Sequence, residues 1–147
     1  MSPHPCLPVP RAERQRLTLA AHLALQALLA GEQQDAWLDL PAAAGVATEL
    51  LAGREVDVDV LRAVERAAAA LLDTAGLRTP TAEVKAACIA FVPCFEAILA
   101  AVTYRRLIAA QSVTRAAWQA HAAAYVGPRA CGAGRRLGPA GTPQYKR

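Results

Sequence analysis

Apolar residues recur every three or four positions through most of this chain, the periodicity of helices with one buried face. The first such stretch covers residues 11–30 and ends at Gly31, a residue type that favours the left-handed conformation following a helix. Its expected core stripe consists of Leu17, Ala20, Ala21, Ala24 and Leu28, widened by Leu19, Leu23 and Ala27. Four prolines among residues 1–10 predict an extended segment before it.

A second helical stretch covers about residues 33–52 and is closed by Gly53. Pro41 lies inside it and removes a backbone donor. We therefore expect either a kink at Pro41 or a short turn followed by a helix from about Ala42.

Residues 56–60 alternate apolar and acidic side chains with period two, which on its own is typical of a strand. No partner strand is apparent elsewhere in the chain. We interpret Asp57 and Asp59 instead as cap and first-turn residues of a third helix, about residues 57–74, because carboxylates stabilise the positive end of a helix.

The connector Gly-Leu-Arg-Thr-Pro at residues 76–80 predicts a fourth helix with Thr79 as its N-cap, running to about Gln111 with a kink near Pro93. A last helical piece is expected over residues 112–125. From residue 126 onward Gly, Pro and Arg dominate, and this composition predicts a disordered basic tail. The expected fold is an all-α bundle of four to five helices over residues 11–125, followed by that tail.

The segment from Ala86 to Thr103 is almost wholly apolar and approaches the length of a membrane span. Glu96 near its centre would cost about 3 kcal/mol on insertion. We favour a buried central helix over a membrane span.

Composition and charge refine this picture. The chain contains 36 alanines and 5% aromatic residues, which favours thin, closely packed helices. Its formal net charge of +4 combines an acidic stretch, residues 17–75 with nine acids and three bases, and a basic one, residues 76–147 with ten bases and two acids. Such asymmetry is typical of a nucleic-acid or membrane surface, or of two halves of a bundle that attract each other.

The four cysteines, Cys6, Cys88, Cys94 and Cys131, form no C-x-x-C pair and no dense disulfide framework. No basic segment followed by an apolar run opens the chain, so we expect no secretory signal, reduced thiols and a cytoplasmic location.

Catalytic, cofactor and metal signatures are not found in the sequence. Cys88 and Cys94 would face about 120° apart on a helix, which suits packing better than shared metal ligation. Gly132-Ala-Gly134 lacks the flanking strand and helix that aim a nucleotide loop. We therefore predict a non-enzymatic protein with no cofactor and no metal.

Nucleic-acid binding is the first functional hypothesis. The candidate residues are Arg105, Arg106, Arg115, Arg129, Arg135 and Arg136, which could contact phosphates without reading sequence. A turn at Ala42-Ala-Ala-Gly45 is the nearest candidate for a helix-turn-helix, but the helix after it is acidic and unsuited to DNA.

Protein–protein interaction, with a partner or a second copy, is the alternative. Trp37 and Trp118 are large amphipathic side chains of the kind found at interfaces, although they would serve equally as core residues. The acidic middle helices would suit an adaptor or inhibitor.

The stretch from Leu19 to Gly31, with a His-x-Ala-Leu pattern from His22 to Leu25 and a glycine at its end, resembles the opening helix of short proteobacterial proteins often labelled Fis family transcriptional regulators. The resemblance covers roughly residues 11–120 and implies a regulatory role. No Fis-type helix-turn-helix is found near the end of this chain, and no functional residue is carried over. The sequence thus predicts an accessory or regulatory binding protein, with membrane association through residues 86–103 as a third hypothesis.

Overall fold

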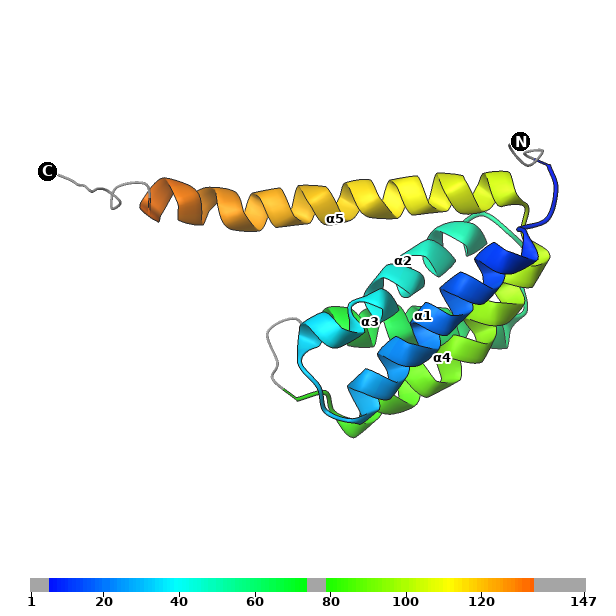
Figure 1. Cartoon of the computed structure of the whole chain (residues 1–147), viewed down its shortest axis with the longest axis horizontal. Coiled ribbons are helices and arrows are strands. Elements are labelled where there is room, and N and C mark those ends of the chain that lie inside the picture. Colours follow the sequence, from blue (N-terminus) through cyan, green and yellow to red (C-terminus); the bar gives the residue numbers. More distant parts are fainter. Residues whose placement is uncertain (1–5, 74–78, 134–147) are drawn as a thin grey trace, which may run out of the picture. The chain divides into compact units, whose positions relative to one another are not determined.

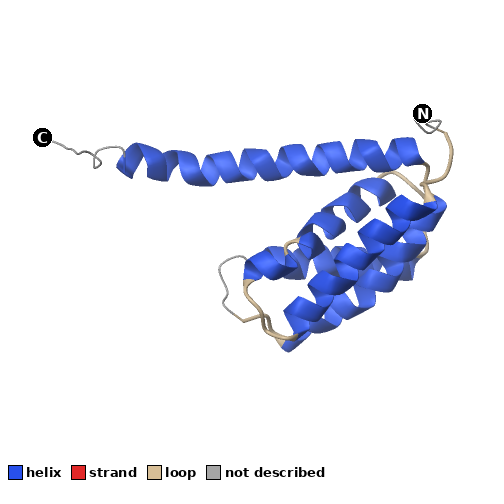
Figure 2. Ribbon diagram, viewed as in Figure 1, coloured by secondary structure: helices blue, strands red, loops and turns tan. Residues whose placement is uncertain are grey.

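A computed structural model describes the backbone of residues 6–73 and 79–133 and the side chains of residues 6–72 and 79–121 (Figure 1). Its helices are α1 (Arg11–Leu29), the 3-10 helix η1 (Gln34–Trp37), α2 (Asp39–Leu51), α3 (Val58–Asp73), α4 (Ala82–Ala101) and α5 (Tyr104–Ala133). The described residues form no strand, only an isolated bridge between Pro8 and Thr103 (Figure 2). The predicted all-α class is confirmed.

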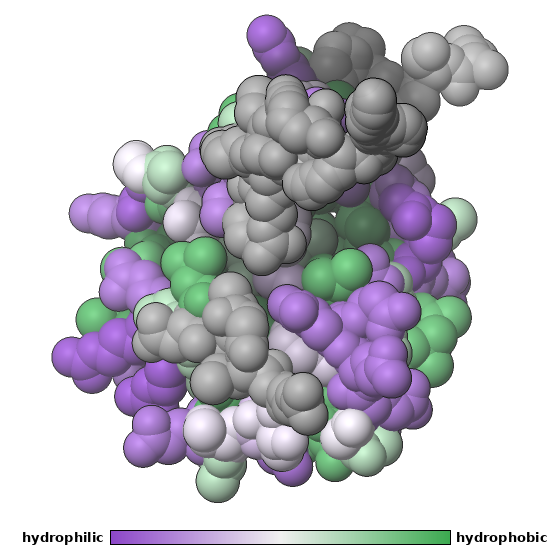
Figure 3. Space-filling view, turned by 90° about the vertical axis from the view of Figure 1, so that its left-hand side faces the viewer, coloured by the Kyte–Doolittle hydropathy of each residue, from purple (hydrophilic) through white to green (hydrophobic). Residues whose placement is uncertain are grey.

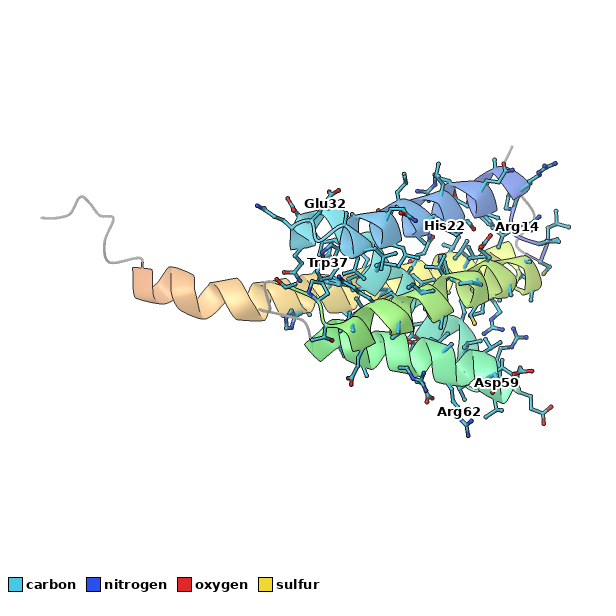
Figure 4. The ribbon with its side chains drawn as sticks, turned by 90° about the horizontal axis from the view of Figure 1, so that it is seen from below. Arg14, His22, Glu32, Trp37, Asp59 and Arg62 are labelled. Carbon is cyan, nitrogen blue, oxygen red and sulfur yellow. The ribbon has the colours of Figure 1, made fainter. Side chains whose placement is uncertain are left out.

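The chain divides into two compact units, residues 1–114 and 115–147. The first is a bundle of α1 to α4 together with the first turns of α5. Within it α4 packs against α1 and α3, and α2 packs mainly against α3. Figure 4 shows α4 running between α1 and α3. The described part of the second unit is the remainder of α5, residues 115–133.

Large side chains fill the centre of the first unit. Those with at most 2% of their surface exposed include Leu28, Trp37, Leu40, Leu50, Phe91, Leu99 and Leu107. The rings of Phe91 and Phe95 stack with their centroids 5.7 Å apart. Each such burial contributes about 1.5–3 kcal/mol. On the face drawn in Figure 3, hydrophobic side chains form separate groups between hydrophilic ones.

The helix ends follow the expected chemistry. Gly31 has a φ of +77°, and its N–H donates to the Leu28 carbonyl while the N–H of Glu32 donates to that of Ala27. These two hydrogen bonds satisfy carbonyls that have no partner within the helix at the end of α1. Asp57 caps α3 by accepting a 2.8 Å hydrogen bond from the N–H of Asp59, so the helical interpretation of residues 56–60 is confirmed.

The second helical stretch is a short turn followed by a longer helix, which is one of the two alternatives expected from Pro41. The 3-10 turn η1 ends at Trp37, and α2 begins at Asp39. Pro41 falls in the first turn of α2, where its missing N–H would have had no partner within the helix.

The fourth helix differs from its prediction at both ends. Its N-cap is Thr81, whose hydroxyl accepts from the N–H of Val84 at 3.3 Å, rather than Thr79. It ends at Ala101, not near Gln111, because Val102 is extended and a new helix begins at Tyr104.

Contacts made by residues 6–10, here called the strap, explain this break. The Leu7 carbonyl accepts a 2.8 Å hydrogen bond from the N–H of Tyr104, and Val9 is buried in the core with 2% exposure. The pairing of Pro8 with Thr103 joins residues almost a hundred positions apart, which local periodicity cannot reveal. Helix α5 then continues to Ala133, beyond the end predicted at Tyr125.

Gly45 lies inside the continuous helix α2 and makes no turn, so the helix-turn-helix interpretation of residues 42–46 is wrong. Its lack of a side chain has another use. A Cβ atom there would lie 2.8 Å from Cγ2 of Thr114 on α5, so glycine allows α5 to approach α2.

Helix α4 is long and apolar enough to cross a membrane by length and composition, with 44% of its most apolar window buried inside the bundle. The buried side carries Val84, Cys88, Phe91, Phe95 and Leu99, among others. One side of α4 therefore belongs to the core, and the opposite side is exposed.

Candidate binding surfaces

The predicted nucleic-acid residues have different environments. Arg105 and Arg115 on α5 are exposed. Arg106 is half-buried and donates from Nη2 to the Leu50 carbonyl at 2.8 Å, so it fastens α5 to the end of α2. Arg129 lies on α5 with its side chain outside the described set, and residues 135 and 136 lie outside the described residues.

The C-terminal third of the chain has a charge of one sign. Glu96 is its last acidic residue, and residues 97–147 contain eight bases and no acid. In the described part of this segment, every side chain from Arg115 to His121 is exposed. Since Arg105 and Arg115 are exposed and this segment contains no carboxylate, both can attract anions.

The two tryptophans differ. Trp37 is 2% exposed and donates from Nε1 to the Glu32 carbonyl at 3.2 Å, so its predicted place at an interface is wrong. It fills the core beneath the turn that joins α1 to α2. Trp118 on α5 is 43% exposed and presents an aromatic surface within the second unit.

A groove opens where α2 ends and α3 begins. It encloses about 370 Å³ and is lined by Leu50, Leu51, Arg54, Glu55, Val56, Asp57, Val60, Ala97, Ile98, Ala101 and Val102. Most of its lining residues are apolar, and its exposed charged residues are Arg54, Glu55 and Asp57. Figure 4 shows Asp59 and Arg62 pointing outward from the neighbouring part of α3.

The outer side of α1 and α4 is unexpectedly apolar. Leu19 is 58% exposed and Leu23 is 61% exposed, so the expectation that they widen the core stripe of α1 is wrong. Ile89 on α4 is 50% exposed. His22 lies 3.2 Å from Glu96, Nε2 to Oε1, and this contact joins the exposed sides of the two helices. We call this surface the α1–α4 face.

Nucleophile and metal chemistry have little support among the described residues. No group of three or more His, Cys, Asp or Glu side chains is arranged there to hold a metal ion. Burial raises the pKa of the Cys88 thiol to about 11, which keeps it protonated and unreactive near neutral pH. Packing is thus the role of Cys88, while Cys94 is partly exposed.

Sequence reasoning missed the structural role of Arg106 and the exposed α1–α4 face. The first depends on a contact across 56 residues of chain. The exposure of the α1–α4 face depends on which neighbours cover α1. Leucine and alanine occupy about half of the circumference of this helix, and the sequence does not reveal how much of that half is buried. Comparisons with family models, curated proteins and solved structures find no match to this chain.

Proposed function

We propose that this chain is a non-catalytic accessory protein that binds the phosphates of nucleic acid through its basic C-terminal segment, in the cytoplasm. The observation that carries the proposal is the run of residues 97–147, with eight bases and no acid, together with the exposure of Arg105 and Arg115. Contacts of this kind give affinity without sequence information.

The number of bases sets a limit on the strength of binding. Arg106 is held by the Leu50 carbonyl, which leaves seven of the eight bases for phosphates. Each phosphate contact contributes a slope of about −0.9 to the dependence of log K on log salt, so the steepest expected slope is about −6. Between 50 and 200 mM salt this slope lowers affinity about 4,000-fold.

Fluorescence anisotropy of a labelled random duplex tests this proposal. The double variant Arg105→Gln/Arg115→Gln should bind more weakly and show a salt slope shallower by about 1.8. The matched control is Arg62→Gln/Arg66→Gln, which removes two exposed arginines from α3. Equal loss in both pairs would mean that net charge alone matters, and it would refute a C-terminal site.

The groove beside α3 supports a second candidate function, the binding of a basic amphipathic segment from another protein. Two carboxylates, Glu55 and Asp57, against one base, Arg54, give this largely apolar groove a net negative charge, which suits a helix that carries both apolar and cationic side chains. Titration with a helical Leu/Lys peptide tests this candidate. Glu55→Lys should weaken binding, whereas Glu49→Lys, an exposed change on α2, should leave it unchanged.

A further inference from the structure

We propose that the α1–α4 face binds the same face of a second copy of this chain, with the two copies antiparallel. The two-fold axis would lie in the interface and cross the helices near His22 and Pro93. This inference does not depend on nucleic-acid binding, because none of the bases proposed to contact phosphates is needed for it.

Most of the side chains that α4 adds to the face are apolar, and the polar pair of His22 and Glu96 lies near its middle. Helix α4 exposes Ala86, Ile89, Ala90, Pro93, Ala97 and Ala100, and α1 adds Leu19. Small side chains let the backbones of two packed helices approach closely. The contact of His22 with Glu96 shows that the exposed sides of α1 and α4 adjoin, so Leu19 and the α4 residues form one surface.

Charges at the two ends of the face indicate which partner fits. The first turns of α1 carry exposed Arg11 and Arg16. Arg16 is paired with Glu13 of the same helix, Nε to Oε1 at 2.7 Å, so Arg11 is the base that would face the partner. Acidic Glu32 and Asp35 follow the other end of α1. Figure 4 shows Glu32 at the opposite end of α1 from Arg14. Since α1 ends beside the start of α4, exposed Glu83 adds to the acidic end (Figure 1).

An antiparallel second copy places the basic end of each protomer against the acidic end of the other. The two-fold axis makes each of these attractions occur twice. Antiparallel α4 helices also place opposite helix dipoles side by side. A parallel two-fold copy would instead place α1 of each protomer on α4 of the other and bring the two basic ends together, so the charge pattern selects the antiparallel arrangement.

The size of the face predicts a weak dimer. A helix of 20 residues such as α4 is about 30 Å long, and two helices side by side are about 20 Å wide, which gives about 600 Å². Stable complexes bury about 800 Å² per partner. We therefore expect a dissociation constant in the micromolar range, near the lower limit of specific interfaces.

Sedimentation velocity on the full chain, in about 0.2 M salt and from about 1 to 200 µM protein, tests the proposal. The expected result is a monomer–dimer equilibrium with its midpoint inside this range. Ile89→Glu and Leu19→Glu should each raise the dissociation constant at least tenfold. The control is Val113→Glu on α5, which changes a side chain with the same 50% exposure as Ile89 but lies outside the face. Thermal unfolding at about 1 µM, where the chain is mainly monomeric, should be the same for each variant and shows that it is folded.

Charge reversal tests the antiparallel arrangement. Arg11→Glu and Glu32→Arg should each weaken the dimer, and the double variant should recover affinity relative to both. A double variant no tighter than the weaker single variant would refute the arrangement.

Three other outcomes would refute the dimer itself: a monomer at every concentration, equal weakening by Val113→Glu, or an Ile89→Glu variant that dimerises normally. Co-sedimentation of monomer with phosphatidylcholine vesicles, abolished by Ile89→Glu, would instead assign the face to a membrane surface.

Discussion

Replacement of Gly45 by alanine tests the close approach of α2 and α5. Inside a helix, alanine is favoured over glycine by about 1 kcal/mol, because glycine loses more backbone entropy on folding. Gly45→Ala would therefore stabilise α2 if its surroundings were open. The structure predicts the opposite result, since the new Cβ would lie 2.8 Å from Cγ2 of Thr114.

The cost follows from what holds Thr114 in place. Thr114 is 8% exposed, and its hydroxyl donates to the Ala110 carbonyl at 2.9 Å. Rotating its methyl away from residue 45 would disturb this hydrogen bond, which is worth about 1 kcal/mol, and overpacking adds about 1–3 kcal/mol. These costs exceed the gain in helix propensity, so we expect Gly45→Ala to lower the free energy of unfolding by about 1 kcal/mol.

Thr114→Ser supplies the matched background, because it removes Cγ2 and keeps the hydroxyl. The remaining Oγ1 would lie 3.6 Å from the new Cβ, an ordinary contact. In this background Gly45→Ala should raise the free energy of unfolding by up to about 1 kcal/mol. Urea denaturation of the four proteins gives a coupling of about 2 kcal/mol between the two positions. Stabilisation by Gly45→Ala in both backgrounds would refute the close approach.

Two further predictions concern the core of the first unit. Arg106→Met should lower the free energy of unfolding by about 1–2 kcal/mol, because it removes the hydrogen bond to the Leu50 carbonyl; Arg105→Met, an exposed change, should have little effect in the same urea titrations. Burial raises the pKa of Cys88 from 9.0 to about 11, so the unfolded chain loses this thiol proton first as the pH rises. The free energy of unfolding is therefore unaffected below pH 9 and falls between pH 9 and 11 by roughly 3 kcal/mol. Cys88→Ala should abolish this fall in stability curves measured against pH. If the stability curves of Cys88→Ala and the natural chain run parallel, Cys88 is not the cause of the fall.

Local patterns were enough to predict the helices whose ends depend on nearby residues. Gly31 after α1 and Asp57 before α3 act within one helical turn, so their roles could be read from sequence. The break between α4 and α5 could not, because Thr103 and Tyr104 are paired there with the strap from the other end of the chain.

The candidate surfaces show the same division. The sign of the C-terminal charge is a property of the sequence, and it motivated the nucleic-acid hypothesis. Whether a given arginine is exposed depends on tertiary contacts. Arg106 donates a hydrogen bond to the Leu50 carbonyl, whereas its neighbour Arg105 is exposed. Trp37 and Leu19 were misassigned for a related reason, since apolar character alone does not tell which side of a helix its neighbours cover.

Phosphate binding by the basic C-terminal segment is best measured as the salt dependence of duplex binding by the intact chain. With two unrelated random duplexes measured from 50 to 200 mM salt, we expect equal affinities for both and a common slope of log K against log salt no steeper than about −6. Absence of binding at 50 mM salt, or binding that does not weaken as salt rises, would contradict it.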